Sequence, residues 1–278
     1  MNPQEVLAGI EAFTDARIVG ELAGGPTSDS YLVKRGKDQY VLRLDTDVAT
    51  ALGLDRIAEA KILQFISQNG LGPMPKYSAP DRGVLVTCYI EGRAWSDTDL
   101  HDAGKIQKLA MLLQRLHALN PEGHEFNLHA RIANYGGIIG SVEGRELADE
   151  TQKLLSKLEM NSTDPCLCHN DLISANIIEG QGLALIDWEY AAMGDACFDL
   201  ATIAEHHQFD QDEAEVLLSA YFGQVLAEHV SRLSRYRVLY SQLLLLWSAA
   251  VDQLCETSFD QRVQLQQMWC RWSEGTAG

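Results

Sequence analysis

The chain has 278 residues, 46% of them hydrophobic, which is enough to bury the core of one large domain or of two lobes. It carries 22 basic and 39 acidic residues, a formal net charge of −17, so it lacks the positive surface that a nucleic-acid-binding protein uses to neutralise phosphates. The N-terminus does not read as a signal peptide, and the longest apolar stretch, from Leu243 to Val251, is too short to cross a bilayer, so we expect a cytoplasmic protein.

The first ninety residues predict a small sheet with one helix. Four short apolar or alternating runs predict strands, the second and third joined by a hairpin turn at residues 35–38. The expected strands cover 17–22, 30–34, 39–45 and 84–90. Residues 54–68 carry apolar side chains at helical spacing, and Asn69-Gly70 marks the end of that helix.

From about residue 98 the pattern becomes mainly helical. Residues 101–118 are strongly amphipathic, a looser stretch rich in Asn and Gly follows, and another helix is expected near 143–159. Short strands are then expected around Leu167 and over 176–178 and 183–186, and the chain from about Asp195 onward is expected to be helical. This is an α+β organisation with a small sheet-rich N-lobe, residues 1–91, and a larger, mostly helical C-lobe, residues 92–278.

Several small polar side chains interrupt the apolar runs of residues 168–190, CHNDLISANIIEGQGLALIDWEY. A hairpin in this segment would bring Asn176 and Asp187 together at one edge. An amide oxygen beside a carboxylate suits Mg²⁺, which takes oxygen ligands and leaves room for phosphate and water. Asp171, set back in the loop, would accept a proton from a hydroxyl nucleophile, while Mg²⁺ offsets charge on a transferring phosphoryl group.

The motif HNDLISAN (169–176) resembles the catalytic loop of the protein-kinase-like phosphotransferases, with the Asp-to-Asn spacing of the protein-kinase loop. The segment LIDWEYAAMGDACFDLA (185–201) resembles the metal-binding segment of the aminoglycoside phosphotransferase and choline kinase superfamily. Its IDWEY form is similar to the choline, ethanolamine and thiamine kinase branch. The resemblance covers most of the chain and implies a bilobal protein-kinase-like fold with an antiparallel sheet in its N-lobe.

The same resemblance implies how the nucleotide is held. Residues 22–31 (LAGGPTSDSY) resemble the glycine-containing nucleotide loop, and residues 87–92 (TCYIEG) resemble the hinge that meets the adenine. Arg43 corresponds to the base that contacts the ATP phosphates, and Glu59 to its ion-pair partner. The residues implied on the nucleotide side are Gly24, Gly25, Ser28, Arg43, Glu59, Thr87 and Tyr89.

On the catalytic side, the resemblance implies that Asp171 is the catalytic base or the residue that positions the substrate hydroxyl. Asn176 and Asp187 are the implied Mg²⁺ ligands. Asp199 would order the catalytic loop by accepting hydrogen bonds from its backbone N–H groups. His169 would support the loop in the same way rather than move protons.

The substrate side is implied by three residues. Glu189 and Tyr190 follow the metal-binding Asp187 and would line a pocket for an ammonium or thiazolium group, which needs aromatic faces and a nearby carboxylate. Trp247 lies where choline kinases carry a tryptophan-bearing helix, and it suits the pocket and the core equally. Those kinases often have a second tryptophan three positions earlier, where this chain has Leu244, so a thiamine-like or other amino-alcohol substrate stays open.

We therefore predict an ATP- and Mg²⁺-dependent kinase that phosphorylates the hydroxyl of a small amine alcohol such as choline, ethanolamine or thiamine. One alternative is an aminoglycoside or amino-sugar phosphotransferase of the same fold, which the IDWEY form disfavours. Another is a non-catalytic nucleotide-binding relative, which the intact Asp171, Asn176 and Asp187 disfavour. The run from Asp187 to Asp199 is too short for the activation segment of a protein kinase. The expected partner is the small substrate, not nucleic acid or a membrane, and a homodimer is compatible with the sequence.

The remaining reactive side chains have structural interpretations. None of the cysteines forms a CxxC pair, so we expect small buried hydrophobic side chains in a reducing compartment rather than zinc ligands or disulfides. His117, at the end of an amphipathic helix, is expected to cap or pack rather than bind a ligand. The cysteines are Cys88, Cys166, Cys168, Cys197, Cys255 and Cys270.

Overall fold

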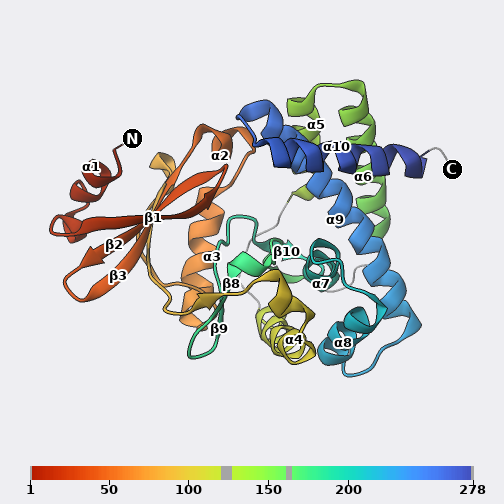
Figure 1. Cartoon of the computed structure of the whole chain (residues 1–278), viewed down its shortest axis with the longest axis horizontal. Helices are drawn as coiled ribbons and strands as arrows, with labels where there is room; N and C mark the ends of the chain where they lie inside the picture. Colours follow the sequence, from red (N-terminus) through yellow and green to blue (C-terminus); the bar gives the residue numbers. More distant parts are fainter. Residues whose placement is uncertain (1, 120–126, 161–164, 277–278) are drawn as a thin grey trace.

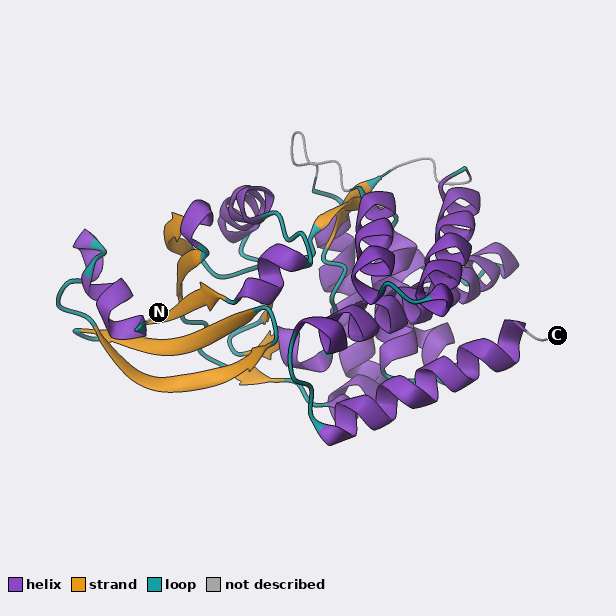
Figure 2. Cartoon of the chain, turned by 90° about the horizontal axis from the view of Figure 1, so that it is seen from above, coloured by secondary structure: helices purple, strands orange, loops and turns teal. Residues whose placement is uncertain are grey.

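The computed structural model describes residues 2–119, 127–160 and 165–276. Within that part of the chain, an antiparallel sheet of five strands lies at one end of the molecule and most of the helices lie at the other (Figures 1 and 2). The strands follow the order β1-β2-β3-β5-β4. Their bounds are β1 Arg17–Gly25, β2 Ser28–Arg35, β3 Asp38–Asp45, β4 Pro75–Ala79 and β5 Val84–Cys88. All except β4 confirm the sequence prediction.

β4 escaped the sequence analysis because it is short and lies at the edge of the sheet. It begins with Pro75, which is tolerated at the start of an edge strand, and none of its residues is fully buried. The hairpin between β2 and β3 turns at Gly36, whose φ of 60° is in the left-handed region that glycine adopts without strain. The predicted turn at residues 35–38 is therefore confirmed.

One face of the sheet is covered by the N-terminal segment. Alternate residues of β3 (Tyr40, Leu42 and Leu44) are buried on this face, as the two-residue period of a strand requires. They belong to a cluster with α1 (Pro3–Ala8) and with Phe13, whose ring meets that of Tyr40 edge to face at 5.0 Å. This cluster gives the sheet an apolar core of its own.

The predicted helix after β3 is present as α3 (Arg56–Gln68), preceded by the short α2 (Asp47–Ala51), which the sequence did not predict. Asp55 caps α3 by accepting hydrogen bonds from the N–H groups of Ile57 and Ala58. The buried apolar side chains of α3 belong to the large core shared with the C-terminal helices. Because α3 packs on that core, Glu59 on its first turn is held where the two parts of the molecule meet.

The helical part is built around α9. It packs against α5, α6, α7 and α10, while α4 packs against α8. The bounds are α4 Ala103–His117, α5 Leu128–Ile139, α6 Val142–Glu159, α7 Ala196–His206, α8 Gln211–Phe222, α9 Ala227–Leu254 and α10 Phe259–Thr276. The predicted helices at 101–118 and 143–159 are confirmed.

The expectation of a loose stretch before residue 143 is wrong for residues 128–139, which form α5. Asn127 caps this helix by accepting a hydrogen bond from the N–H of Ala130. A Cβ on Gly136 would lie 2.8 Å from the Cβ of Ala148 in α6. The glycine therefore permits close packing of two helices, and it does not mark a loop.

The segment with the catalytic-loop motif is bracketed by short strands. β7 (Cys166–Cys168) pairs with β10 (Ala192–Gly194), and β8 (Ile177–Glu179) pairs with β6 (Arg93–Ala94) and β9 (Leu183–Leu185). The three strands predicted here are confirmed within a residue or two. The described residues also form short 3-10 turns, which are η1 Glu11–Phe13, η2 Pro80–Arg82, η3 Asp97–His101 and η4 Ser174–Asn176.

The α+β class, with a small antiparallel sheet and a larger helical part, is confirmed. The lobe boundary between residues 91 and 92 stays a prediction. It falls between the last sheet strand, β5, and β6. Among the residues described, none of the helices combines the length and the apolar character needed to span a membrane.

Candidate active site

The backbone of the catalytic-loop motif is held by Asp199. This aspartate lies in the first turn of α7 and is fully buried. Its Oδ2 accepts a hydrogen bond from the N–H of His169 at 2.9 Å, and its Oδ1 accepts one from the N–H of Asn170 at 2.7 Å. Asn170 has a φ of 66°, a conformation that asparagine tolerates better than most residues. A buried carboxylate thus fixes the turn that leads into Asp171.

His169 joins the motif to the metal segment. Its Nε2 lies 2.9 Å from the carbonyl oxygen of Ile186, and its Nδ1 accepts a hydrogen bond from the N–H of Asp171 at 3.3 Å. Because a carbonyl only accepts and a backbone N–H only donates, the proton is on Nε2. Burial lowers the pKa of His169, which keeps the ring neutral. These contacts suit a residue that supports the loop.

Asp171 and Asn176 are in direct contact. The Nδ2 of Asn176 donates hydrogen bonds to Oδ2 and to the backbone oxygen of Asp171, both at 2.9 Å. Because Nδ2 makes both bonds, the amide oxygen of Asn176 is available as a metal ligand. Burial, with the negative charge of Glu189 as the second cause, raises the pKa of Asp171 to about 7. A carboxylate of that basicity suits proton acceptance near neutral pH.

Asp187 lies beside this pair. The N–H of Ile186 donates to the backbone oxygen of Asn176 at 3.0 Å. This hydrogen bond holds the backbone before Asp187 against that of Asn176, so the two predicted metal ligands are neighbours. Asp187 has a φ of 64°, a strained value for a residue other than glycine, and its side chain is 42% exposed. The charges of Asp171 and Glu189 repel that of its carboxylate. Crowded carboxylate oxygens beside an amide oxygen fit a divalent cation such as Mg²⁺.

Arg43 and Glu59 form the predicted ion pair. Nη1 and Nη2 of Arg43 lie 2.5 and 2.6 Å from the two carboxylate oxygens of Glu59, a bidentate geometry, and both side chains are largely buried. Nη1 also lies 3.8 Å from Oδ1 of Asp187. Among the described residues, the buried Nε of Arg43 has no hydrogen-bond partner. A buried donor of this kind fits an anionic ligand such as a phosphate group.

The sequence analysis missed Arg56, which extends this ion pair into a network. Its Nη1 lies 2.9 Å from Glu59 and 2.9 Å from Glu189, and its Nε lies 2.8 Å from Asp45. The spacing of three residues between Arg56 and Glu59 on α3 was a signal, since residues at i and i+3 are neighbours on a helix. The contacts with Asp45 and Glu189 are tertiary and left no local pattern.

Glu189 is held by protein groups on two sides. Thr27 Oγ1, in the turn between β1 and β2, lies 3.1 and 3.3 Å from the two carboxylate oxygens of Glu189. Nη1 of Arg56 donates to Oε2 of the same carboxylate at 2.9 Å. Glu189 is buried and its carboxylate already has these partners. The structure therefore places Glu189 as a link between the glycine-containing hairpin and the metal segment, although it also contributes to the cavity wall described next.

A cavity of about 660 Å³ joins the glycine-containing hairpin to the catalytic loop and to α9. Trp247 lies in its wall, and its Nε1 donates to the hydroxyl of Tyr190 at 2.9 Å. The predicted residues that line the cavity are Gly24, Gly25, Asp171, Asn176, Asp187, Glu189, Tyr190 and Trp247. Further aromatic side chains in the wall are Tyr135, Phe198, Tyr236 and Tyr240.

The remaining predicted nucleotide residues lie outside this wall. Ser28 is buried at the start of β2, and a Cβ on Gly24 would approach its backbone oxygen to 2.9 Å. Gly24 is therefore needed for the close approach of the two strands. Thr87 is buried in β5 opposite Val41, and the N–H of Tyr89 donates to the oxygen of Gln39 at 3.0 Å. The adenine contacts expected of Thr87 and Tyr89 stay predictions.

His117 contributes to the support of the catalytic loop, which the sequence analysis did not foresee. Its Nε2 lies 3.0 Å from Oδ2 of Asp199, and its Nδ1 lies 2.7 Å from the hydroxyl of Tyr221. The side chain is 4% exposed. The expectation that His117 caps or packs is therefore incomplete. His117 is also a hydrogen-bond partner of Asp199, the aspartate that holds the loop.

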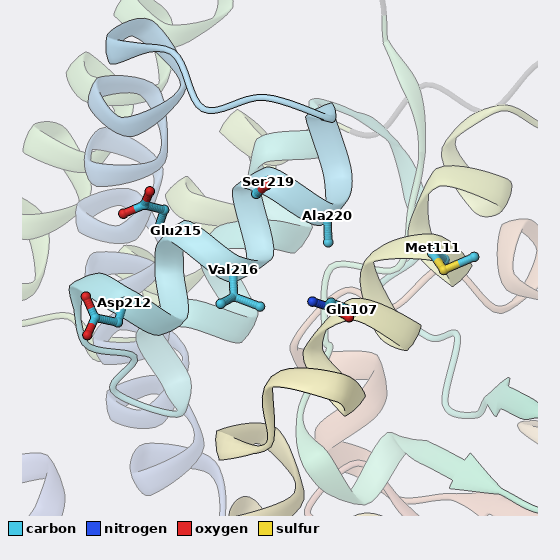
Figure 3. Close-up of a pocket in the computed structure, with 7 residues that line it drawn as sticks. All are labelled: Gln107, Met111, Asp212, Glu215, Val216, Ser219 and Ala220. Carbon is cyan, nitrogen blue, oxygen red and sulfur yellow. The ribbon is translucent and has the colours of Figure 1, made fainter.

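A second cavity, of about 580 Å³, lies between α4 and α8 (Figure 3). None of the residues predicted for catalysis or binding lines it. Its wall consists of Gln107, Met111, Asp212, Glu215, Val216, Ser219 and Ala220. The residues of the catalytic-loop motif and of the metal-binding segment line the larger cavity instead.

The buried ion pair predicts a large effect on stability. Replacing Glu59 with Gln leaves Arg43 and Arg56 buried with one fewer anionic partner, and we expect the free energy of unfolding to fall by about 3 kcal/mol. Urea unfolding followed by circular dichroism measures it. Glu21→Gln, at an exposed position of β1, is the matched control and should change stability by less than about 0.5 kcal/mol. Equal stabilities of the two variants would contradict the assigned role of the network.

Known proteins share both the sequence pattern and the fold. The sequence profile of the phosphotransferase enzyme family matches residues 19–233. Protein LicA of Haemophilus influenzae is 27% identical over 248 residues, which are 83% of this chain and 72% of that protein. The solved structure of choline kinase LicA from Streptococcus pneumoniae is similar with a TM-score of 0.79 at 26% identity, covering 96% of each chain.

Two further structures widen this comparison. A structure of LicA in complex with AMP aligns with the same TM-score, 0.79, at 26% identity, covering 97% of this chain and 96% of that one. The ADP-bound aminoglycoside phosphotransferase APH(2'')-Ib aligns with a TM-score of 0.60 at 17% identity, covering 91% of this chain and 93% of that one. At 17% identity, the comparison with APH(2'')-Ib shows a similarity of fold alone.

Proposed function

This chain belongs to the phosphotransferase enzyme family and transfers a phosphoryl group to the alcohol group of a small molecule, and we propose that it is an ATP- and Mg²⁺-dependent kinase of a small amine alcohol such as choline, ethanolamine or thiamine. The observation that carries the proposal is the single cavity in which Asp171, Asn176 and Asp187 face an aromatic wall and a glycine-containing hairpin. These are the parts that phosphoryl transfer to an alcohol needs.

Each part of the site would have a separate role in the reaction. Gly24 and Gly25 would lie over the ATP phosphates, and Arg43, held by Glu59, would contact them. Asn176 and Asp187 would hold Mg²⁺, which would offset the negative charge of the phosphates. Asp171 would hold the substrate hydroxyl and accept its proton as the oxygen attacks the γ-phosphorus and the bond to ADP breaks. Positioning and charge stabilisation account for most of the rate in such a transfer.

The charge of the cavity favours a cationic acceptor. Asp171 and Asp187 lie in its wall, and the aromatic side chains offer faces to an ammonium group. One face of Tyr190 is already covered, since the guanidinium of Arg131 lies 5.0 Å from the centre of its ring. A substrate ammonium would therefore use the neighbouring aromatic faces, including that of Trp247, at a distance from Arg131.

Arg131 is thus expected to weaken the binding of a cationic substrate. We expect Arg131→Met to lower the KM for choline by roughly threefold to tenfold, because a like charge is removed from the cavity. Steady-state kinetics at saturating ATP measure it. Arg115→Met, at an exposed position of α4, is the control and should leave KM unchanged. A higher KM in Arg131→Met would instead indicate that this arginine binds an anionic group of the true acceptor.

A substrate panel tests the proposal itself. Purified protein with ATP and MgCl₂ is offered choline, ethanolamine, thiamine, amino sugars and aminoglycosides, and ADP release is measured. We expect the highest kcat/KM for one of the small amine alcohols. Highest activity with an aminoglycoside or amino sugar would replace the proposal by the alternative of the same fold. Absence of turnover with every hydroxylated amine, despite Mg²⁺-dependent ATP binding, would favour the non-catalytic alternative.

A further inference from the structure

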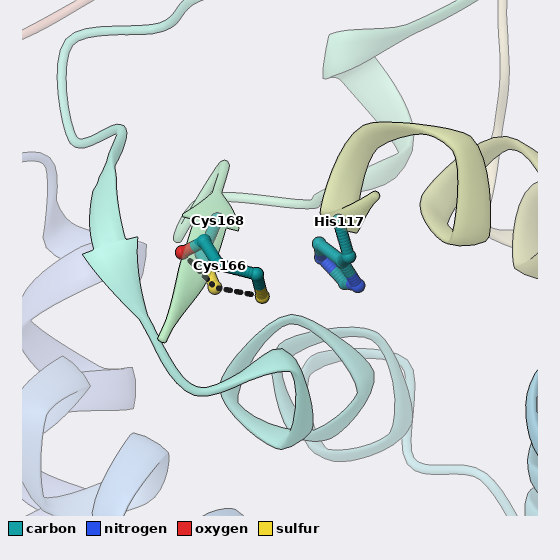
Figure 4. Close-up of side chains that lie close together, drawn as sticks. All are labelled: His117, Cys166 and Cys168. Carbon is teal, nitrogen blue, oxygen red and sulfur yellow. Dashed lines mark hydrogen bonds between the residues drawn. The ribbon is translucent and has the colours of Figure 1, made fainter. Parts of the chain in front are cut away.

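Three potential metal ligands gather between β7 and the end of α4, and none of them lines the active-site cavity (Figure 4). Cys166 and Cys168 are two residues apart on this strand, so their side chains point to the same face. His117 reaches them from the last turn of α4. One ligand atom from each of the three residues lies within 4.8 Å of the others. Cys168 is buried, Cys166 is half-buried, and the side chain of His117 is 4% exposed.

The spacing of the two sulfur atoms fits a soft metal ion. Cys166 Sγ and Cys168 Sγ are 3.8 Å apart. Two thiolates at about 2.3 Å from a tetrahedral Zn²⁺ ion are about 3.8 Å apart, whereas the sulfur atoms of a disulfide are about 2.05 Å apart. Both cysteines are free thiols in this structure. Two sulfurs and an imidazole select Zn²⁺ or another thiophilic ion, and they do not suit Mg²⁺ or Ca²⁺.

The surroundings of His117 also fit a metal ligand. Its Nε2 faces the carboxylate of Asp199 at 3.0 Å. If Nε2 carries the proton, the lone pair of Nδ1 is available to a metal, which is the carboxylate–histidine–metal arrangement common in metal sites. Nδ1 is now 2.7 Å from the hydroxyl of Tyr221, and this bond would give way to the ion.

We propose that Cys166, Cys168 and His117 form a binding site for a thiophilic divalent cation, with Zn²⁺ as its occupant, and that this site stabilises the catalytic loop through Asp199. On binding, each thiol releases one proton, and the ion forms two bonds to sulfur, one to nitrogen and a fourth to a water molecule. The same Oδ2 of Asp199 that faces His117 accepts the hydrogen bond from the N–H of His169. An ion that fixes the imidazole therefore fixes the carboxylate that holds the loop.

The test is metal binding by the reduced full-length chain. The exposed Cys270 is first replaced by Ser, so that this surface thiol does not bind the ion, and a phosphine reductant keeps the other thiols reduced. Zn²⁺ affinity is measured by competition with a chromophoric chelator, and Co²⁺ reports thiolate ligation through its charge-transfer absorption. We expect one tight site per chain. Adding Cys166→Ser or Cys168→Ser should weaken the affinity for Zn²⁺ at least about 100-fold.

Cys255→Ser in the same background is the matched control and should leave the affinity unchanged, since Cys255 lies at the end of α9. The midpoint of thermal unfolding should rise on addition of Zn²⁺, fall again with EDTA, and show neither change in Cys166→Ser. Because Cys166 is half-buried, this variant carries the test even where the buried Cys168→Ser does not fold.

Two results would overturn the proposal. One is Co²⁺ bound without thiolate charge-transfer absorption. The other is a Zn²⁺ affinity that is the same in Cys166→Ser as in its parent, which would assign the binding to surface groups. Neither measurement uses phosphoryl transfer, so the outcome is independent of the proposed kinase activity.

Discussion

An Asp171→Asn variant is expected to lose about 1,000-fold in kcat for phosphorylation of its alcohol substrate, with little change in the affinity for MgATP. The amide has no lone pair basic enough to take the hydroxyl proton. Its oxygen still accepts a hydrogen bond, so the contact with Nδ2 of Asn176 is kept and the loop stays in place. The measurement is ADP release with the best acceptor from the substrate panel, beside nucleotide binding by calorimetry.

The control for Asp171→Asn is the same substitution at Asp149, an exposed position of α6, which should keep full activity. Circular dichroism and the midpoint of thermal unfolding show whether the fold is retained. Wild-type turnover by a folded Asp171→Asn protein would refute the assignment of Asp171 as the group that receives the hydroxyl. A decrease of only a few-fold in kcat would indicate that Asp171 positions the substrate and that the proton leaves by another route.

An Asp187→Asn variant is expected to lose at least about 1,000-fold in kcat/KM for MgATP, because a neutral amide binds a divalent cation far more weakly than a carboxylate does. Asparagine tolerates the left-handed backbone that Asp187 adopts, so the substitution changes the charge without adding backbone strain. Activity is measured as a function of MgCl₂ concentration. The concentration for half-maximal activity should rise by at least about tenfold.

Asp81→Asn, in the exposed turn before β5, serves as the matched control and should keep the wild-type Mg²⁺ dependence. The two active-site variants are distinguishable from each other. The Asp171 variant should bind MgATP and fail in the transfer step, whereas the Asp187 variant should fail at metal binding. If the Mg²⁺ dependence of Asp187→Asn matched that of the wild type, another residue would have to be the metal ligand.

The fold and the central site were predictable from sequence because their signals are local. The strands and helices follow from apolar periodicity, and HNDLISAN places an acid, an asparagine and a turn within one short segment. Arg43 lies on β3 and Glu59 on α3, and the family pattern specifies the order of these two elements. The structure then adds the geometry: the bidentate contact between these two side chains and the hydrogen bonds that Asn176 makes to Asp171.

The partners of Glu189 and the role of His117 were not predictable in the same way. Glu189 meets Thr27 across 162 positions of sequence, and His117 meets Asp199 across 82. Contacts at that range depend on how whole elements pack, and a single sequence has no periodic pattern that records them. The helical character of residues 128–139 was missed for a related reason. Glycine disfavours an isolated helix, and only the close approach of α6 explains Gly136.

The hydrogen bond from Thr27 to Glu189 has a consequence for the turnover cycle. In the proposed reaction this hairpin covers the phosphates, so release of ADP would require the tip of the hairpin to lift. Lifting it breaks this bond and leaves the carboxylate to Arg56 alone. The hydroxyl of one threonine thus couples any movement of the glycine-containing hairpin to the segment that carries Asp187.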